Sequence, residues 1–81
     1  MSPIEQKEQL DKKLQRVREL AQILKLHEGQ TITAEQRMEH ENLQAKLEFR
    51  LNELVMRSKM EEADIRIAIF EAMVNVLNQK A

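Results

Sequence analysis

The apolar stretch from Ala63 to Leu77 constrains the fold of this chain more than any other part of the sequence. Read as a helix, it carries two neighbouring apolar stripes, because residues three and four positions apart lie on one face. The first stripe comprises Ala63, Ile67, Phe70, Val74 and Leu77, and the second comprises Ile65, Ile69, Met73 and Val76. A helix that is apolar over so much of its circumference is buried on more than one side.

Three other interpretations of this stretch are weaker. Ile65, Ile67 and Ile69 alternate as in a β-strand, but no Gly or Pro follows Gly29 and no second strand candidate exists for pairing. A membrane-spanning helix needs about 20 apolar residues, and charged residues interrupt this shorter stretch. A helix on a membrane surface usually has a polar face rich in Lys and Arg. We therefore expect no membrane association.

The composition indicates a single helical domain over residues 1–81. One Gly and one Pro leave few turns, and 33% charged with 42% hydrophobic residues argues against a disordered chain. So short a chain is near the lower limit for a self-sufficient core, and oligomerisation is a common remedy. The net charge of −1 gives no bulk attraction to nucleic acid. The absence of Cys excludes disulfides, thiolate zinc sites and Cys nucleophiles.

A first helix is predicted over residues 3–28, followed by a loop over residues 29–33. Ser2 can cap its start, with Pro3 at the first helical position and Glu5 completing a capping box. Its apolar residues recur at steps of four and three: Leu10, Leu14, Val17, Ala21 and Leu24, widened by Leu20 and Ile23. Gly29 fits the left-handed position that ends many helices.

Residues 34–79 contain no strong helix breaker, so the sequence favours one long second helix. A short connection favours an antiparallel pair, and we expect Leu10, Leu14, Val17 and Leu24 to face Leu43, Leu47, Leu51 and Leu54. The long helix would span roughly 68 Å and the first helix only about 39 Å. Its far half would then lack cover from the same chain. The predicted fold is all-α: an antiparallel helical hairpin with a long, coiled-coil-like C-terminal helix.

The alternative is a three-helix bundle, with a break near residues 57–59. Ser58 and Glu61 form a capping-box pattern there. Against a break, Lys59 and Met60 favour helix, and no Gly or Pro marks a turn. Helix propensity therefore favours the continuous helix.

The sequence offers little for catalysis or ligand binding. His27 and His40, the only histidines, lack the spacings of helical metal sites, and in a hairpin they would be offset by about two turns. Ser2 and Ser58, the only serines, both fit helix caps, and a single Gly provides no phosphate-binding loop. We expect no enzymatic activity and no metal, cofactor or small-molecule ligand.

The uncovered apolar half of the long helix predicts a non-enzymatic protein–protein interaction module. It would self-associate and bind a partner, as an adaptor, inhibitor, co-chaperone or assembly subunit. The predicted protein interface comprises Met56, Met60, Ala63, Ile67, Phe70, Met73, Val74 and Leu77. Methionines suit an adaptable groove, and Phe70 is the expected anchor. The N-terminus shows no apolar signal region, so cytoplasmic residence is expected.

The alternative function is a small oligomeric nucleic-acid-associated regulator. Lys12, Lys13 and Arg16 cluster on the first helix, and Lys46 and Arg50 lie one turn apart. Duplex binding needs a basic face and base stacking needs aromatic residues. Acidic residues interrupt both patches, so the sequence favours a protein partner.

Overall fold

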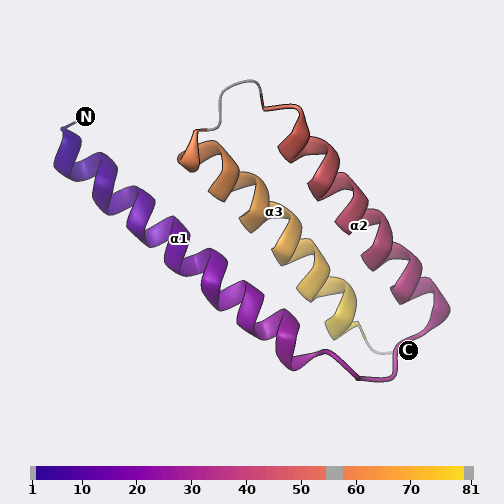
Figure 1. Ribbon diagram of the computed structural model, residues 1–81. Helices are drawn as coiled ribbons and strands as arrows, with labels where there is room; N and C mark the ends of the chain where they lie inside the picture. The colour runs from indigo at the N-terminus through magenta and orange to yellow at the C-terminus, as the bar shows by residue number, and fades with distance from the viewer. Residues whose placement is uncertain (1, 55–57, 80–81) are drawn as a thin grey trace.

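The computed structural model describes residues 2–54 and 58–79, which form three α-helices (Figure 1). Helix α1 spans Pro3–Leu26, α2 spans Ala34–Asn52 and α3 spans Lys59–Asn78. The described residues contain no strand, and the predicted all-α fold is confirmed. None of these helices combines the length and the apolar character required to traverse a bilayer.

Each helix begins at a hydroxyl side chain. The Oγ atom of Ser2 accepts a hydrogen bond from the backbone N–H of Glu5 at 3.2 Å. The Oγ1 atom of Thr33 accepts one from the N–H of Gln36 at 3.0 Å, and the Gln36 side chain accepts one from the N–H of Thr33 at 2.9 Å. This reciprocal pair is a capping box at the start of α2. Gly29 has a φ of +85°, the left-handed conformation expected after α1.

A break between α2 and α3 replaces the continuous helix that was favoured over residues 34–79. Helix α2 ends at Asn52, and Ser58 has an extended backbone with a φ of −73° and a ψ of 123°. The Oγ atom of Ser58 caps α3 by accepting a hydrogen bond from the N–H of Glu61 at 3.3 Å. The break predicted near residues 57–59 lies partly outside the described residues, which omit 55–57. The structure therefore has the three-helix alternative.

The reason for this correction is that burial outweighs helix propensity. Propensity differences amount to a few tenths of a kcal/mol per residue, whereas burying one large apolar side chain contributes about 1.5–3 kcal/mol. A continuous helix would have left the apolar stripes of Ala63 to Leu77 without cover from the same chain. With the break, α3 packs against both of the other helices.

Helix α3 lies between α1 and α2, as Figure 1 shows. Helices α1 and α3 run in the same direction, and α2 runs opposite to both. In the described part of the chain, close backbone contacts join α3 to each neighbour but do not join α1 to α2. The Cα atoms extend over 47 × 24 × 16 Å. This flattened shape is that of three helices side by side, since packed helices are about 8–10 Å apart.

This arrangement makes the predicted pairing of the first two helices wrong. The two sets of residues expected to face each other were Leu10, Leu14, Val17 and Leu24, and Leu43, Leu47, Leu51 and Leu54. Helix α3 separates them, because its apolar surface is wide enough to receive a neighbour on each side. Each set therefore lies on a helix that packs against α3.

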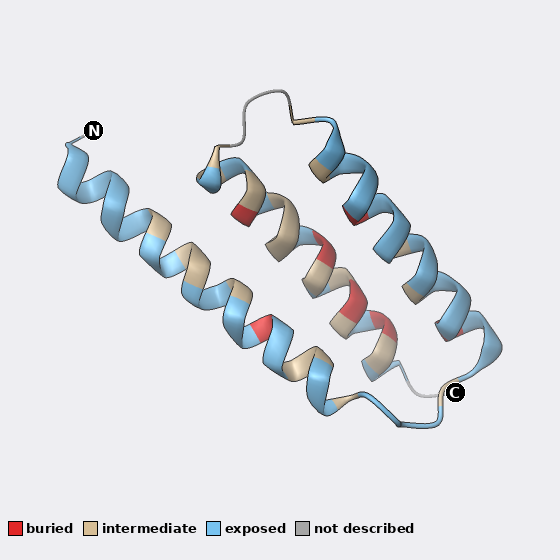
Figure 2. Ribbon diagram, in the orientation of Figure 1, coloured by how far each residue is buried: buried red, intermediate tan, exposed pale blue. Residues whose placement is uncertain are grey.

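The core is centred on the second stripe of α3. Ile69 and Met73 form a buried cluster with Leu47 of α2. Five half-buried side chains pack against this cluster: Leu24, Leu43, Leu51, Ile65 and Phe70. In Figure 2 burial is concentrated along α3, while most of α1 and α2 is exposed. The prediction that this stretch is buried on more than one side is confirmed, and its cover comes from the same chain.

Gln36 ties the start of α2 to the end of α3. Its side chain is buried, and Nε2 donates hydrogen bonds to the carbonyl oxygens of Val76 at 3.0 Å and Gln79 at 2.7 Å. The Oε1 atom accepts the N–H of Thr33 at the same time. The amide thus contacts backbone groups at the start of α2 and at the end of α3, where the carbonyl oxygen of Val76 also accepts the N–H of Gln79 at 3.2 Å.

Candidate protein-binding surfaces

The seven described residues of the predicted interface are buried or half-buried. Met56 lies outside the described residues. Ala63 and Met73 are buried, with 2% and 1% of their surface exposed. The other five are half-buried: Met60, Ile67, Phe70, Val74 and Leu77. Because α1 and α2 flank α3, they cover much of the surface that the sequence assigned to another molecule.

A different apolar surface lies on the side of α2 that faces away from the core. Met38 and Phe49 are 64% and 65% exposed. They are eleven residues apart, close to three turns of 3.6 residues, and therefore project from the same side of the helix. Asn42 and Ala45 lie between them and are also exposed. We call these four residues the outer α2 face.

Position along the helix explains why this face is free. Leu47, the buried residue that α2 contributes to the core cluster, is roughly half a turn from Phe49 around the helix. Packing of Leu47 against α3 therefore directs Phe49 toward solvent. The remaining exposed large hydrophobic residues, Ile4 and Leu26, lie near opposite ends of α1 and form no common patch.

Charged side chains border the outer α2 face on both sides. By helical position, Arg37, Glu41 and Glu48 lie along one edge, and Glu39 and Lys46 lie along the other. All five are exposed. Within the described residues, none of them forms an ion pair. These charges remain available to another molecule.

The sequence contains a signal for the outer α2 face that was not recognised. Met38, Ala45 and Phe49 are separated by seven and four residues, which are spacings of one helical face. The leucines of α2 form a stronger stripe and identify the core side. A short apolar stripe among charges on the opposite side has the pattern of an ordinary solvated surface.

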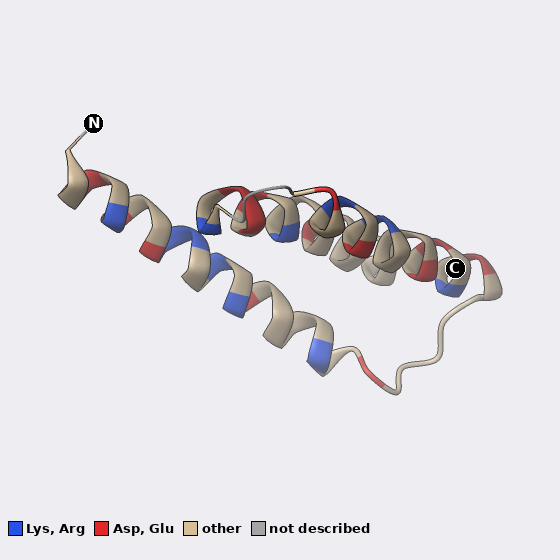
Figure 3. Cartoon of the chain, turned by 45° about the horizontal axis from the view of Figure 1, so that its top comes forward, with Lys and Arg blue, Asp and Glu red and all other residues tan. Residues whose placement is uncertain are grey.

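The basic residues considered for nucleic-acid binding are partly neutralised within the chain. Lys13 of α1 pairs with Asp64 of α3. Arg16 pairs with Glu71 of α3 at 3.5 Å and with Glu19 at 3.5 Å. Figure 3 shows Lys and Arg interspersed with Asp and Glu along the helices. No continuous basic track is therefore present on the described helices.

The structure brings the two histidines to the same hollow of the surface. Both line a small cavity of about 180 Å³ near the C-terminal end of α3, together with Leu24, Ile32 and Leu77. The Nδ1 atom of His27 lies 2.8 Å from Oε1 of Gln30. The predicted offset of about two turns assumed direct packing of α1 on α2, which does not occur. In the described part of the chain, no group of three His, Cys, Asp or Glu is placed to hold a metal ion.

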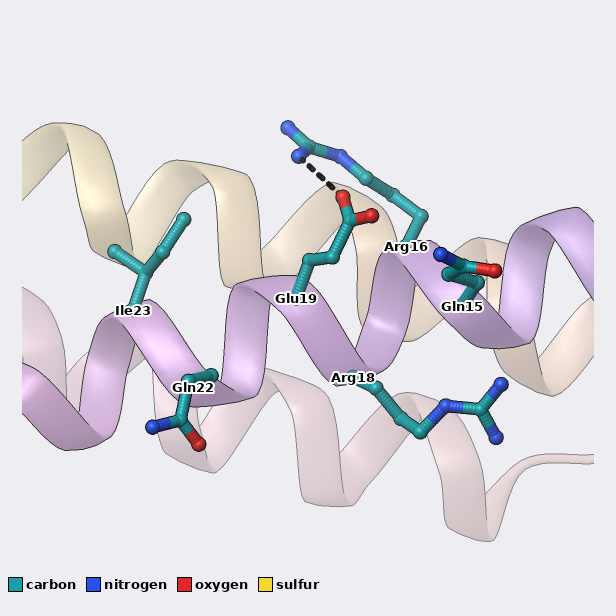
Figure 4. Close-up of a pocket in the computed structure, with 6 residues that line it drawn as sticks. All are labelled: Gln15, Arg16, Arg18, Glu19, Gln22 and Ile23. Atoms are coloured by element: carbon teal, nitrogen blue, oxygen red, sulfur yellow. Dashed lines mark hydrogen bonds and ion pairs between the residues drawn. The ribbon is translucent and has the colours of Figure 1, made fainter.

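Two further hollows do not define ligand sites. One is an open depression on α1, lined by Gln15, Arg16, Arg18, Glu19, Gln22 and Ile23. Figure 4 shows these side chains spreading from a single helix in different directions, so the depression has no second wall. The other lies between the starts of α1 and α3, beside Leu10 and Met60. It is bordered by Ser58, next to residues that the structure does not describe.

Comparison with known proteins found no matching family model, curated protein or solved structure. The fold is a flat layer of three helices with α3 at its centre. Its outer α2 face combines two exposed apolar side chains with unpaired flanking charges. The functional argument rests on these features of the chain itself.

Proposed function

We propose that the protein is a non-enzymatic protein–protein interaction module that self-associates and acts by binding a partner. It would serve as an adaptor, inhibitor, co-chaperone or assembly subunit. The observation that carries this proposal is the outer α2 face, where Met38 and Phe49 project away from the core. Methionine and aromatic residues are enriched at the centres of protein interfaces.

The size of the apolar contribution supports this assignment. If a partner covered about 100 Å² on each of Met38 and Phe49, the gain would be roughly 5 kcal/mol at about 25 cal/mol per Å². Association itself costs about 4–15 kcal/mol. The two side chains would therefore offset a large part of that cost, whereas an exposed ion pair contributes about 0–1 kcal/mol. Phe49 is the expected anchor.

The half-buried residues of α3 lie apart from the outer α2 face and do not carry the proposal. Ile67, Phe70, Val74 and Leu77 retain some exposure and remain predicted interface residues. Phe70 also packs against the buried cluster of Leu47, Ile69 and Met73. Its replacement would therefore change the stability of the fold as well as any contact with a partner.

The alternative of a nucleic-acid-associated regulator has less support. Lys13 and Arg16, two of the three basic residues clustered on α1, already pair with acidic residues of α3. Phosphate binding would require their release, and its affinity would fall steeply with salt. No observation on the described residues favours this second function.

The test is capture of partners from an extract of the native source by the purified, tagged protein and two variants. Phe49→Ala removes the expected anchor, and Ile4→Ala is the matched control because Ile4 is 72% exposed on another helix. We expect Phe49→Ala to lose at least about nine-tenths of the captured partner, since each 1.4 kcal/mol is tenfold in affinity. Ile4→Ala should retain it.

Circular dichroism of both variants provides the control for folding. Phe49→Ala should keep the helical signal of the unmodified protein, because its side chain is outside the core. A folded Phe49→Ala protein that captures the same partners at the same levels would overturn the proposal. Partner capture that instead disappears only with a helix-preserving change at Ile67 or Leu77 would move the interface to α3.

A further inference from the structure

We propose that the partner on the outer α2 face is a second copy of this chain, packed with its α2 helix antiparallel to the first. This inference rests on the proposed function and names one occupant of the same surface. A two-fold axis midway between Met38 and Phe49 would place Met38 against Phe49 of the partner subunit, and Asn42 against the partner's Ala45. Each large side chain would then meet a large side chain, and a small residue would lie at the centre.

Charge complementarity on one edge supports the second copy. Such a two-fold axis brings each edge of the face against the same edge of the other copy. Lys46 then lies two residues, or about 3 Å along the axis, from the level of Glu39 of the partner subunit. On the other edge, Arg37 and Glu41 both lie at this offset from the partner's Glu48, so attraction and repulsion oppose each other there. The symmetry doubles the contact of Lys46 with Glu39 of the partner subunit and gives two ion pairs from side chains that form no ion pair within the described chain.

The antiparallel direction has two further consequences. The positive N-terminal end of each α2 would lie beside the negative C-terminal end of the other, which is favourable for helix dipoles. Glu35 would approach Glu53 of the partner subunit at both ends of the contact. These two residues are exposed, so water and salt screen their repulsion. The attractive pairs of Lys46 with the partner's Glu39 lie nearer the centre of the contact than these glutamates do.

The contact is a weak and salt-sensitive one. A single pair of helices of 19 residues each forms an interface at the small end of the range for specific complexes. We therefore expect a dimer with a dissociation constant on the order of micromolar. The flanking ion pairs are exposed, so raising the salt concentration should weaken the dimer.

The experiment is sedimentation equilibrium of the full chain across micromolar concentrations. The unmodified protein should shift from 9.6 kDa to twice that mass as concentration rises. Phe49→Ala should weaken dimerisation by about tenfold or more, as expected for an interface anchor. Ile4→Ala, on the exposed side of α1, should leave it unchanged.

A charge exchange identifies the arrangement. Lys46→Glu alone should weaken the dimer, and Glu39→Lys combined with Lys46→Glu should restore it, because the exchanged pair is complementary again. In a parallel pair Lys46 would face the partner's Glu48, and the exchange would not restore association. Circular dichroism confirms that each variant is folded. A constant mass of one chain, an unaffected Phe49→Ala dimer, or a failed restoration would each overturn the inference.

These outcomes separate this inference from the proposed function. A protein that stays monomeric but captures another protein through Phe49 would refute the second copy and the self-association, and it would leave partner binding by the outer α2 face standing. A dimer that persists in Phe49→Ala, with partner capture also unchanged, would refute both. A dimer that follows the charge exchange supports the second copy irrespective of what the extract contains.

Discussion

Helices α2 and α3 carry the same two kinds of large side chain in opposite environments. On α3, Met73 is 1% exposed and Phe70 packs against the buried cluster. On α2, Met38 and Phe49 are 64% and 65% exposed. The intrinsic hydrophobicity is the same, so position in the layer makes the difference. Helix α3 has a neighbour on each side, and α2 has only one.

The largest expected effect is the difference in stability between the variants Met73→Ala and Met38→Ala. Met73→Ala should lower the free energy of unfolding by about 2–5 kcal/mol, because it removes a buried side chain and leaves a cavity. Met38→Ala, the matched control, should change it by no more than about 0.5 kcal/mol. Urea denaturation at a protein concentration below that of self-association provides the measurement. Equal losses in the two variants would contradict the difference between these helices.

A smaller effect is expected at the polar contact between α2 and α3. Gln36→Ala would leave the N–H of Thr33 and the carbonyl groups of Val76 and Gln79 without their side-chain partner. We expect a loss of about 1–3 kcal/mol in the free energy of unfolding, because three hydrogen bonds are removed and each contributes about 0.5–1.5 kcal/mol. Gln44→Ala, at an exposed position of the same helix, should be nearly neutral. A neutral Gln36→Ala would show that water replaces these bonds at no cost.

Local features of the fold could be predicted from the sequence, and its spatial order could not. The caps at Ser2 and Thr33, the turn at Gly29 and the two stripes of α3 follow from interactions between residues close in the chain. The cap at Ser58 was recognised as well, but helix propensity was given more weight than burial. Whether α2 packs on α1 or on α3 depends on how much apolar area each pairing buries. Those buried areas can be compared only when the three-dimensional positions of the helices are known.

The candidate site was predicted less well for a related reason. The sequence assigns residues of Ala63 to Leu77 to an intermolecular surface because the first predicted helix is too short to cover the far half of a continuous second helix. Once the chain breaks before α3, two helices flank it, so that Ala63 and Met73 are buried and the other described residues of the predicted interface are half-buried. The exposed pair Met38 and Phe49 could be recognised only after Leu47 had defined the inner side of α2. Local periodicity does not show which of two helical faces remains exposed once the helices have packed.

The smallest effect distinguishes the two contacts that α3 makes. Toward α2 its contact is mainly apolar, whereas toward α1 it also includes the ion pair between Lys13 and Asp64. The side chains of this pair remain 34% and 52% exposed, so solvent screens their attraction. Asp64→Asn should therefore lower the free energy of unfolding by about 0–1 kcal/mol at low salt. Asp11→Asn is the control, because Asp11 is exposed and forms no ion pair with a described residue.

Salt dependence decides whether that loss is electrostatic. The Debye length falls from about 10 Å at 0.1 M salt to about 3 Å at 1 M, so the difference between Asp64→Asn and the unmodified protein should shrink across this range. The difference for Asp11→Asn should stay near zero throughout. A loss for Asp64→Asn that is above about 1.5 kcal/mol and independent of salt would exceed what an exposed ion pair contributes. The contact of α3 with α1 would then depend on the packing of Asp64, and it would resemble the contact with α2 more closely than the charges suggest.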